Sequence, residues 1–402
     1  MEKIDLEKAL ELVLARVMPI NETQGIPLTM SLGQVTGEPI YAPLDNPPFN
    51  RSPLDGFTLR SEDTCTASAD SPVRLGIAGV VYAGKPWDRV LMPGEAVRIM
   101  TGGVIPEGGD CVVPKEEVRE DGTTVLLSRP LEHYQNYVFQ GEDIRKGQLL
   151  IPQGERLCFI HLGILATMGL AVVSVIRPPR IGILCTGSEL SSPGKPLVPG
   201  KIYNSNEVLL GSRLGELGFT PRILPSMGDT ATPVAREIGG HIDDVDLFIT
   251  TGAVSVGDKD IMREVFDILG VERLFWRMTC KPGGAILCGV YRGKLLMCLS
   301  GNPFAGLTTF ELLVKPVLAK LTGRTDLWPQ RQRGILQNTF SKESGRQRRF
   351  VRARLEKGLV TLPQGHSSGH LFSLLGCNCL VDIPLGSGAL CTGSEVEVIM
   401  LE

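Results

Sequence analysis

Segments with strand character alternate with segments with helix character between residues 177 and 323, and this alternation constrains the fold more than any other feature of the chain. Such alternation predicts a mostly parallel, doubly wound α/β sheet, whose ligand binds where the strands end. We expect strands at residues 180–184, 221–224, 246–250, 285–289 and 295–299. We expect helices at residues 206–217, 232–241, 261–269 and 303–321, the last kinked at Pro316 because proline lacks a backbone N–H.

A turn rich in glycine and serine follows the apolar segment at 246–250. It contains Ser255 and Gly257 and then delivers two carboxylates, Asp258 and Asp260. Backbone N–H groups in such a turn bind phosphate, and neighbouring carboxylates bind a divalent cation. The turn therefore predicts a site for a phosphorylated ligand.

Other polar residues fall at the same edge of the predicted sheet. They are Gly187, Ser188 and Glu189 after the first strand, Asp229 after the second, Lys281 in a Pro-Gly-Gly turn, and Gly301, Asn302 and Pro303 before the last helix. Three acids at adjacent strand ends, Glu189, Asp229 and Asp260, suit Mg²⁺. Lys281 is either a cation for an oxyanion or a solvated side chain in a turn.

Short strand-like segments broken by proline and glycine lie on both sides of the α/β region. Before it we expect a helix at 5–18 and a β-rich region with strands at 73–76, 95–100, 111–114 and 124–127. After residue 328, five short strands predict a small β-barrel or sandwich. Arginines at 346–354 are interpreted mostly as a solvated strand face, and His366 and His370 as structural residues.

Composition narrows the class of function. With 41 basic and 44 acidic side chains the net charge is −3, which predicts no recruitment of nucleic acid or of an anionic membrane. The ten cysteines form no C-x-x-C pair and are interpreted as buried residues in a reducing compartment. No targeting signal is evident at the amino terminus, and the most apolar segment, 163–176, is too short to span a bilayer. We therefore expect a cytoplasmic protein.

Seven motifs occur in a fixed order along the chain. They are residues 51–56, 98–102 with 106–108, 141–144, 186–189, 254–257 with Asp260, 281–283 and 301–303. Together they resemble the molybdopterin molybdenumtransferase family, which includes bacterial MoeA and the carboxyl-terminal domain of gephyrin. The resemblance covers nearly the whole chain.

The resemblance implies an elongated homodimer of multidomain subunits. The implied parts are an amino-terminal helix packed on the α/β domain (1–21), a linker and β domain (22–44 and 142–176), a β-rich domain reaching the partner subunit (45–141), a molybdopterin-binding α/β domain (177–328), and a carboxyl-terminal β-barrel (329–402). A molybdopterin adenylyltransferase and molybdoenzymes are the protein partners that it suggests.

The implied reaction inserts molybdenum from molybdate into adenylylated molybdopterin, with Mg²⁺-dependent release of AMP. The residues implied as catalytic are Asp55, which would come from the other subunit, Thr101, Asp143, Glu189, Asp229, Asp260 and Lys281. Mg²⁺ would be held by Glu189, Asp229 and Asp260. The residues implied as ligand contacts are Gly187, Ser188, Ser255, Gly257, Gly301, Asn302, Pro303, Arg352 and Ser368, with molybdate near Lys281, Arg352 and Ser368.

Four positions depart from the family pattern. Family members usually have lysine at Gly284, aspartate at Ser188, glycine at Ala253 and a small hydroxyl residue at Ala305. A lost charge-assisted contact or hydrogen bond beside an oxyanion is worth about 1–3 kcal/mol, so the pocket is either weaker for molybdate or adapted to tungstate. Two alternatives stay open: a paralogue acting on another pterin or nucleotide phosphate, and a gephyrin-like scaffold without turnover.

Overall fold

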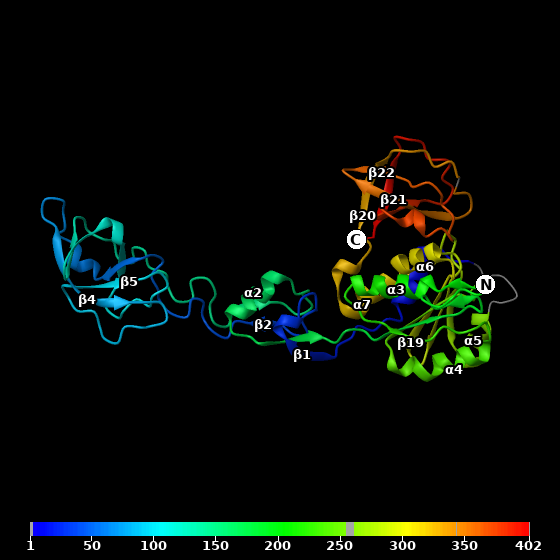
Figure 1. The fold of residues 1–402 in the computed structure, drawn as a ribbon, viewed down its shortest axis with the longest axis horizontal. Helices are drawn as coiled ribbons and strands as arrows, with labels where there is room; N and C mark the ends of the chain where they lie inside the picture. Colours follow the sequence, from blue (N-terminus) through cyan, green and yellow to red (C-terminus); the bar gives the residue numbers. More distant parts are fainter. Residues whose placement is uncertain (1–2, 255–260, 343, 402) are drawn as a thin grey trace.

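The computed structural model describes residues 3–254, 261–342 and 344–401, and Figure 1 shows an elongated molecule. A β domain that contains β4 (Val73–Val81) and β5 (Glu95–Ile99) forms one end. An α/β domain built around β19 (Lys294–Leu299) and an adjoining β-barrel form the other end. No helix in the described ranges is both long and apolar enough to cross a membrane.

The α/β domain is built on a six-stranded sheet with the strand order β14-β11-β15-β19-β18-β16. Its other strands are β11 (Ile181–Cys185), β14 (Arg222–Ile223), β15 (Leu247–Thr251), β16 (Glu272–Trp276) and β18 (Leu287–Tyr291). The first four strands in this order are parallel, and β18 runs antiparallel to both of its neighbours. The predicted doubly wound, mostly parallel sheet is thus confirmed.

Helices cover both faces of this sheet (Figure 1). One face is covered by α4 (Ala231–His241) and α5 (Ile261–Leu269), and the other by α1 (Leu6–Leu14), α3 (Ser205–Glu216), α6 (Pro303–Thr309) and α7 (Lys315–Thr322). Every residue of β11 and β15 is buried, as expected for parallel strands between two helical layers. The carboxyl ends of the strands therefore meet at one edge, where the polar turns lie.

The last helix of the α/β domain is interrupted, but not at the residue expected. A π-helical turn, Phe310–Val314, separates α6 from α7, and Pro316 lies in the first turn of α7. Pro316 has no N–H to donate, and its ring crowds the carbonyl four residues earlier. The regular α-helical hydrogen bonds therefore give way to the π-helical turn just before the proline.

The distal β domain is a six-stranded sheet with the order β6-β3-β5-β4-β8-β7. Besides β4 and β5 it contains β3 (Gly56–Leu59), β6 (Cys111–Pro114), β7 (Arg119–Asp121) and β8 (Thr124–Leu127). The strands between the two ends are β1 (Thr23–Pro27) paired with β10 (Val172–Ile176), and β2 (Ile40–Tyr41) paired with β9 (Leu149–Ile151), beside α2 (Phe159–Thr167). Two further short strands, β12 (Leu190–Ser191) and β13 (Ile202–Tyr203), pair with each other in parallel.

The carboxyl-terminal strands close into the predicted small barrel. They are β20 (Arg331–Leu336), β21 (Arg348–Glu356), β22 (Leu359–Thr361), β23 (Cys379–Ile383) and β24 (Glu395–Met400). A strand of the α/β domain, β17 (Cys280–Lys281), joins the barrel by pairing with β21. This pairing fixes Lys281 against the barrel.

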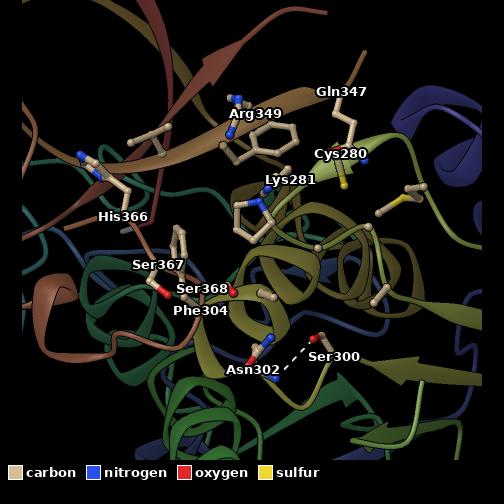
Figure 2. A pocket seen from close by; sticks show the side chains of 18 of the residues that line it. Cys280, Lys281, Ser300, Asn302, Phe304, Gln347, Arg349, His366, Ser367 and Ser368 are labelled. Atoms are coloured by element: carbon tan, nitrogen blue, oxygen red, sulfur yellow. Dashed lines mark hydrogen bonds between the residues drawn. The ribbon is translucent and has the colours of Figure 1, made fainter. Parts of the chain in front are cut away.

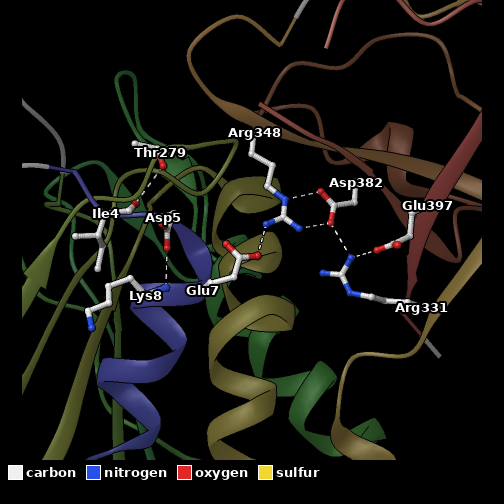
Figure 3. A network of polar contacts seen from close by, with 9 residues as sticks. All are labelled: Ile4, Asp5, Glu7, Lys8, Thr279, Arg331, Arg348, Asp382 and Glu397. Carbon is white, nitrogen blue, oxygen red and sulfur yellow. Dashed lines mark hydrogen bonds and ion pairs between the residues drawn. The ribbon is translucent and has the colours of Figure 1, made fainter. Parts of the chain in front are cut away.

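An ion-pair network strengthens the junction between barrel and α/β domain (Figure 3). Arg348 donates from Nε to Oδ1 and from Nη2 to Oδ2 of Asp382, both at 2.6 Å, and also bonds Glu7 of α1. Asp382 in turn accepts from Arg331 Nη1 at 2.9 Å. The orientation of the barrel, and of the cavities beside it, is therefore tied to the amino-terminal helix.

Candidate active site

A cavity of about 680 Å³ opens at the carboxyl ends of β11, β15 and β19. We call it the strand-edge cavity. Among the predicted site residues, it is lined by Gly187, Glu189, Asp229, Gly301, Asn302 and Pro303. The parallel topology brings these residues together from segments that are far apart in the sequence.

Hydrogen bonds between the loops shape this cavity. Ser188 N donates to Asp229 Oδ2 at 2.9 Å, and Asp229 N donates back to Ser188 Oγ at 3.1 Å. A Cβ on Gly187 would lie 2.8 Å from both carboxylate oxygens of Glu189, so a larger residue at this position would displace the Glu189 side chain. The carboxylates of Glu189 and Asp229 are thereby placed on the walls of one cavity.

The third predicted metal ligand, Asp260, lies outside the described residues, as do Ser255, Gly257 and Asp258. Within the described ranges no group of three His, Cys, Asp or Glu side chains is arranged to hold a metal ion. Glu189 and Asp229 nevertheless fit Mg²⁺ chemically, because this ion binds through one or two carboxylates and keeps several waters.

A second cavity, of about 770 Å³, adjoins the first and shares Ala285, Ser300 and Asn302 with it. Two predicted oxyanion contacts, Lys281 and Ser368, line it, as Figure 2 shows. Its basic lining residues are Lys3, Arg277, Lys281, Lys342 and Arg349, and none of the described residues that line it is acidic. We call it the cationic cavity, since this wall favours an anion.

Arg352, which the resemblance implies as a molybdate contact, does not line the cationic cavity, and it is not one of the solvated arginines of this strand. Its side chain is fully buried and lies 3.7 Å from the ring centroid of Phe304. The guanidinium donates to the carbonyl oxygens of Ser367, at 2.6 Å, and His370, and to Ser373 Oγ at 2.7 Å. Burial lowers the pKa of Arg352 from its usual value. These guanidinium nitrogens already donate to residues of the loop that carries Ser368. Arg352 therefore positions that loop.

His366, interpreted from the sequence as structural, lines the cationic cavity. Its ring packs edge to face on Phe340, with the centroids 5.3 Å apart. Burial lowers the pKa of His366, and the charges of Arg352 and Lys342 lower it further. Apart from Lys281, sequence spacing could not reveal the polar lining of this cavity, since separate segments deliver His366, Lys342 and Arg349 to it.

Asp55 and Thr101 lie together, but on the distal β domain. Thr101 N and Thr101 Oγ1 both donate to Asp55 Oδ1, each at 2.8 Å. These bonds, the backbone one first, lower the pKa of Asp55. Figure 1 places this domain at the end of the molecule opposite the α/β sheet, so one chain does not bring Asp55 to either cavity. Asp143, in the connecting segment, instead accepts from Asn46 Nδ2 at 2.8 Å.

The departures from the family pattern have distinct structural settings. A Cβ on Gly284 would lie 2.6 Å from the carbonyl oxygen of Cys280 and 2.9 Å from that of Met278, so a lysine does not fit without a backbone shift. Ala253 adopts a left-handed conformation with φ of 51°, which suits glycine better. Ala305 is buried in the wall of the cationic cavity.

Comparison with known proteins finds similarity along most of the chain. Residues 4–169 match the MoeA N-terminal region (domains I and II), residues 182–320 a probable molybdopterin-binding domain, and residues 333–401 the MoeA C-terminal region (domain IV). The molybdopterin molybdenumtransferase of Staphylococcus epidermidis is 33% identical over 99% of this chain and 96% of its own length. That of Staphylococcus aureus is 33% identical over 95% and 93%.

Solved structures show the same likeness. One structure of the molybdopterin biosynthesis MoeA protein from Pyrococcus horikoshii matches with a TM-score of 0.90 at 32% identity, over all of both chains. Another from that organism matches with a TM-score of 0.80 at 28% identity, over 99% of this chain and all of the other. The similarity therefore extends to the arrangement of the whole elongated molecule.

Proposed function

The chain belongs to the molybdopterin molybdenumtransferase family, and from that premise we propose that it inserts molybdenum from molybdate into adenylylated molybdopterin with release of AMP. The observation that carries the proposal is the pair of adjoining cavities. One offers carboxylates at a turn-rich sheet edge, and the other offers cations without acidic neighbours among the described residues. A diphosphate with its metal suits the first, and an oxyanion suits the second.

The residues of the strand-edge cavity bind and orient the diphosphate. Glu189 and Asp229 would hold Mg²⁺, with Asp260 as a further ligand from outside the described residues. When bound, Mg²⁺ neutralises charge that develops on the phosphate oxygens. Asn206 Nδ2 donates to Gly301 O at 2.8 Å and so ties the start of α3 to the turn that borders the phosphates.

The residues of the cationic cavity orient molybdate. Lys281 supplies a point charge and Ser368 a hydroxyl donor, while Arg352 holds the loop that carries Ser368. Because β17 pairs with β21, Lys281 and the barrel wall keep a fixed separation. The oxyanion is then held beside the diphosphate instead of diffusing into solvent.

We further propose that the functional unit is a homodimer. Asp55, whose pKa is lowered by its bonds from Thr101, lies on a domain that its own chain holds away from the cavities, so a second copy would bring Asp55 to them. Asp143 would orient the connecting segment. A molybdopterin adenylyltransferase would supply the substrate, and molybdoenzymes would receive the product. Exposed free thiols at Cys65 and Cys391 suit the reducing cytoplasm.

The test is AMP release from adenylylated molybdopterin with Mg²⁺, while molybdate is titrated against tungstate. Release that depends on either oxyanion supports the transferase and identifies its metal. Release indifferent to both favours the paralogue, and no release favours the scaffold. Ala305→Ser is the cleaner restoration of the family pattern, because Gly284→Lys would collide with two backbone carbonyls.

A further inference from the structure

Arg277 is a basic residue of the cationic cavity for which the roles proposed above do not account. Its backbone is left-handed, with φ of 75°, a conformation that costs free energy for any residue with a Cβ. Two hydrogen bonds hold it there: Arg277 N donates to Ile286 O at 2.8 Å, and Ile4 N donates to Arg277 O at 3.3 Å. A strained residue in the wall of a cavity points to a functional constraint.

Arg277 lies across a tight turn from Gly284. Met278 N donates to Gly284 O at 3.1 Å, and the bond from Arg277 to Ile286 runs beside it, so the two segments pair on either side of the turn that carries Lys281. A Cβ on Gly284 would lie 2.9 Å from the carbonyl oxygen of Met278. The side chain of Arg277 therefore leaves the backbone next to the position that Gly284 occupies.

This turn excludes a side chain at position 284, where the resemblance implies a lysine. A Cβ there would collide with the carbonyl oxygens of Cys280 and Met278. Arg277 and Gly284 both line the cationic cavity. The chain thus carries a long cationic side chain on the opposite segment of the same turn, where a side chain fits.

The charge of Arg277 is not neutralised by the described residues. Its guanidinium carbon lies 4.6 Å from the ring centroid of Trp276, and that of Arg263 lies 4.4 Å from the same centroid. Arg277 forms no ion pair with a described residue, and none of the described lining residues is acidic. Because stacking uses the face of a guanidinium, the N–H groups in its plane stay available to a ligand.

Arg292 provides the contrast within the same domain. It is also left-handed, with φ of 49°, and its guanidinium carbon also lies over the preceding aromatic ring, 5.2 Å from the centroid of Tyr291. It lines neither site cavity, and its Nη1 donates to Asp243 Oδ2 at 2.7 Å. The two arginines share a local arrangement, but only the one in the cationic cavity lacks an acidic partner among the described residues.

We propose that Arg277 contacts the oxyanion in the cationic cavity and supplies the positive charge that a lysine at position 284 would supply in relatives. This inference rests on the proposed function and adds a specificity-determining residue to it. A guanidinium presents N–H donors in a planar fork, whereas a lysine offers a point charge, so the oxyanion is held by a forked contact in this chain.

The test is calorimetric titration of molybdate into wild type, Arg277→Gln and Arg292→Gln. Molybdate affinity should fall about tenfold or more in Arg277→Gln, since a charge-assisted contact is lost, and stay at the wild-type level in Arg292→Gln. Arg277→Lys keeps the charge and should bind molybdate more tightly than Arg277→Gln. Arg277→Gly should bind as weakly as Arg277→Gln, and glycine adopts this φ without strain, so the loss cannot be assigned to a damaged fold.

Three results would overturn the role of Arg277. They are wild-type molybdate affinity in Arg277→Gln, an equal loss of affinity in Arg292→Gln, and an Arg277→Lys variant that binds no more tightly than Arg277→Gln. The titration needs no turnover, so its failure is distinct from a failure of the proposed reaction, which would appear as wild-type protein that releases no AMP with either oxyanion.

Discussion

Ser188 and Asp229 exchange two hydrogen bonds, at 2.9 and 3.1 Å, across the loops that follow β11 and β14. The side chain of each residue accepts a hydrogen bond from the other's backbone N–H, so the pair fixes both loops. Because Asp229 accepts through Oδ2, its Oδ1 is left for a ligand. An aspartate at position 188, as the resemblance implies for the family, would put a second carboxylate beside Asp229. The serine avoids that repulsion and still orients the acid.

Ser188→Ala should lower AMP release about tenfold, because one hydrogen bond that fixes Asp229 is lost. The Mg²⁺ concentration for half-maximal rate should rise, since a less fixed carboxylate holds the ion more weakly. Steady-state rates across a Mg²⁺ titration measure both. Ser226→Ala, in the exposed loop that carries Asp229, serves as the control, and equal Mg²⁺ curves for the two variants would refute the orienting role.

Thr101→Val should shift the acid limb of AMP release to higher pH. The bonds from Thr101 lower the pKa of Asp55, so the ionised form and the activity that needs it persist as pH falls. The variant keeps the backbone bond and loses the hydroxyl one, which raises the pKa part of the way to its usual value. Identical pH profiles for variant and wild type would contradict this account.

Arg352→Lys and Ser368→Ala should affect molybdate binding at the cationic cavity in different ways. Arg352 is buried under four contacts, so its replacement should lower the melting temperature and raise the molybdate concentration needed for half-maximal rate. Ser368→Ala should raise the molybdate requirement alone. Thermal melts and molybdate titrations of both variants separate the positioning role from the contact. A molybdate requirement unchanged in Arg352→Lys would show that the loop holds without it.

Ala253→Gly should stabilise the protein by about 1 kcal/mol, because a left-handed conformation costs an L-residue roughly that much. Ala78→Gly, in β4, is the matched control and should destabilise it instead. Calorimetric melting of the two variants gives the comparison. A lower melting temperature for Ala253→Gly would mean that tertiary contacts, not backbone strain, govern this position.

Periodicity and turn chemistry allowed the α/β fold to be predicted from sequence. They left the carboxyl-terminal strands as either a barrel or a sandwich, and the family resemblance implied the barrel. Parallel strands must end at one edge, so the meeting of Glu189 with Asp229 followed from topology alone. The burial of Arg352 did not follow, because alternation along β21 says which residues share a face but not which face another domain covers. The lining role of His366 was likewise hidden, since it depends on how barrel and α/β domain pack.

The two-residue strand β17 shows a further limit of sequence reasoning. It pairs outside its own sheet, with β21, and this pairing builds the cationic cavity. Strands this short carry no periodic signal, so the junction between domains emerges only from the assembled fold. Sites between domains are for this reason less predictable than sites at strand ends.

The most direct test of the account is activity of a purified heterodimer that pairs an Asp55→Asn subunit with an Asp229→Ala subunit. If a second copy supplies Asp55, one of the two symmetric sites keeps both carboxylates, so molybdate-dependent AMP release should recover to about half of the wild-type rate per dimer. Each variant alone should release almost none. A heterodimer no more active than its two parent variants would contradict a site shared between subunits.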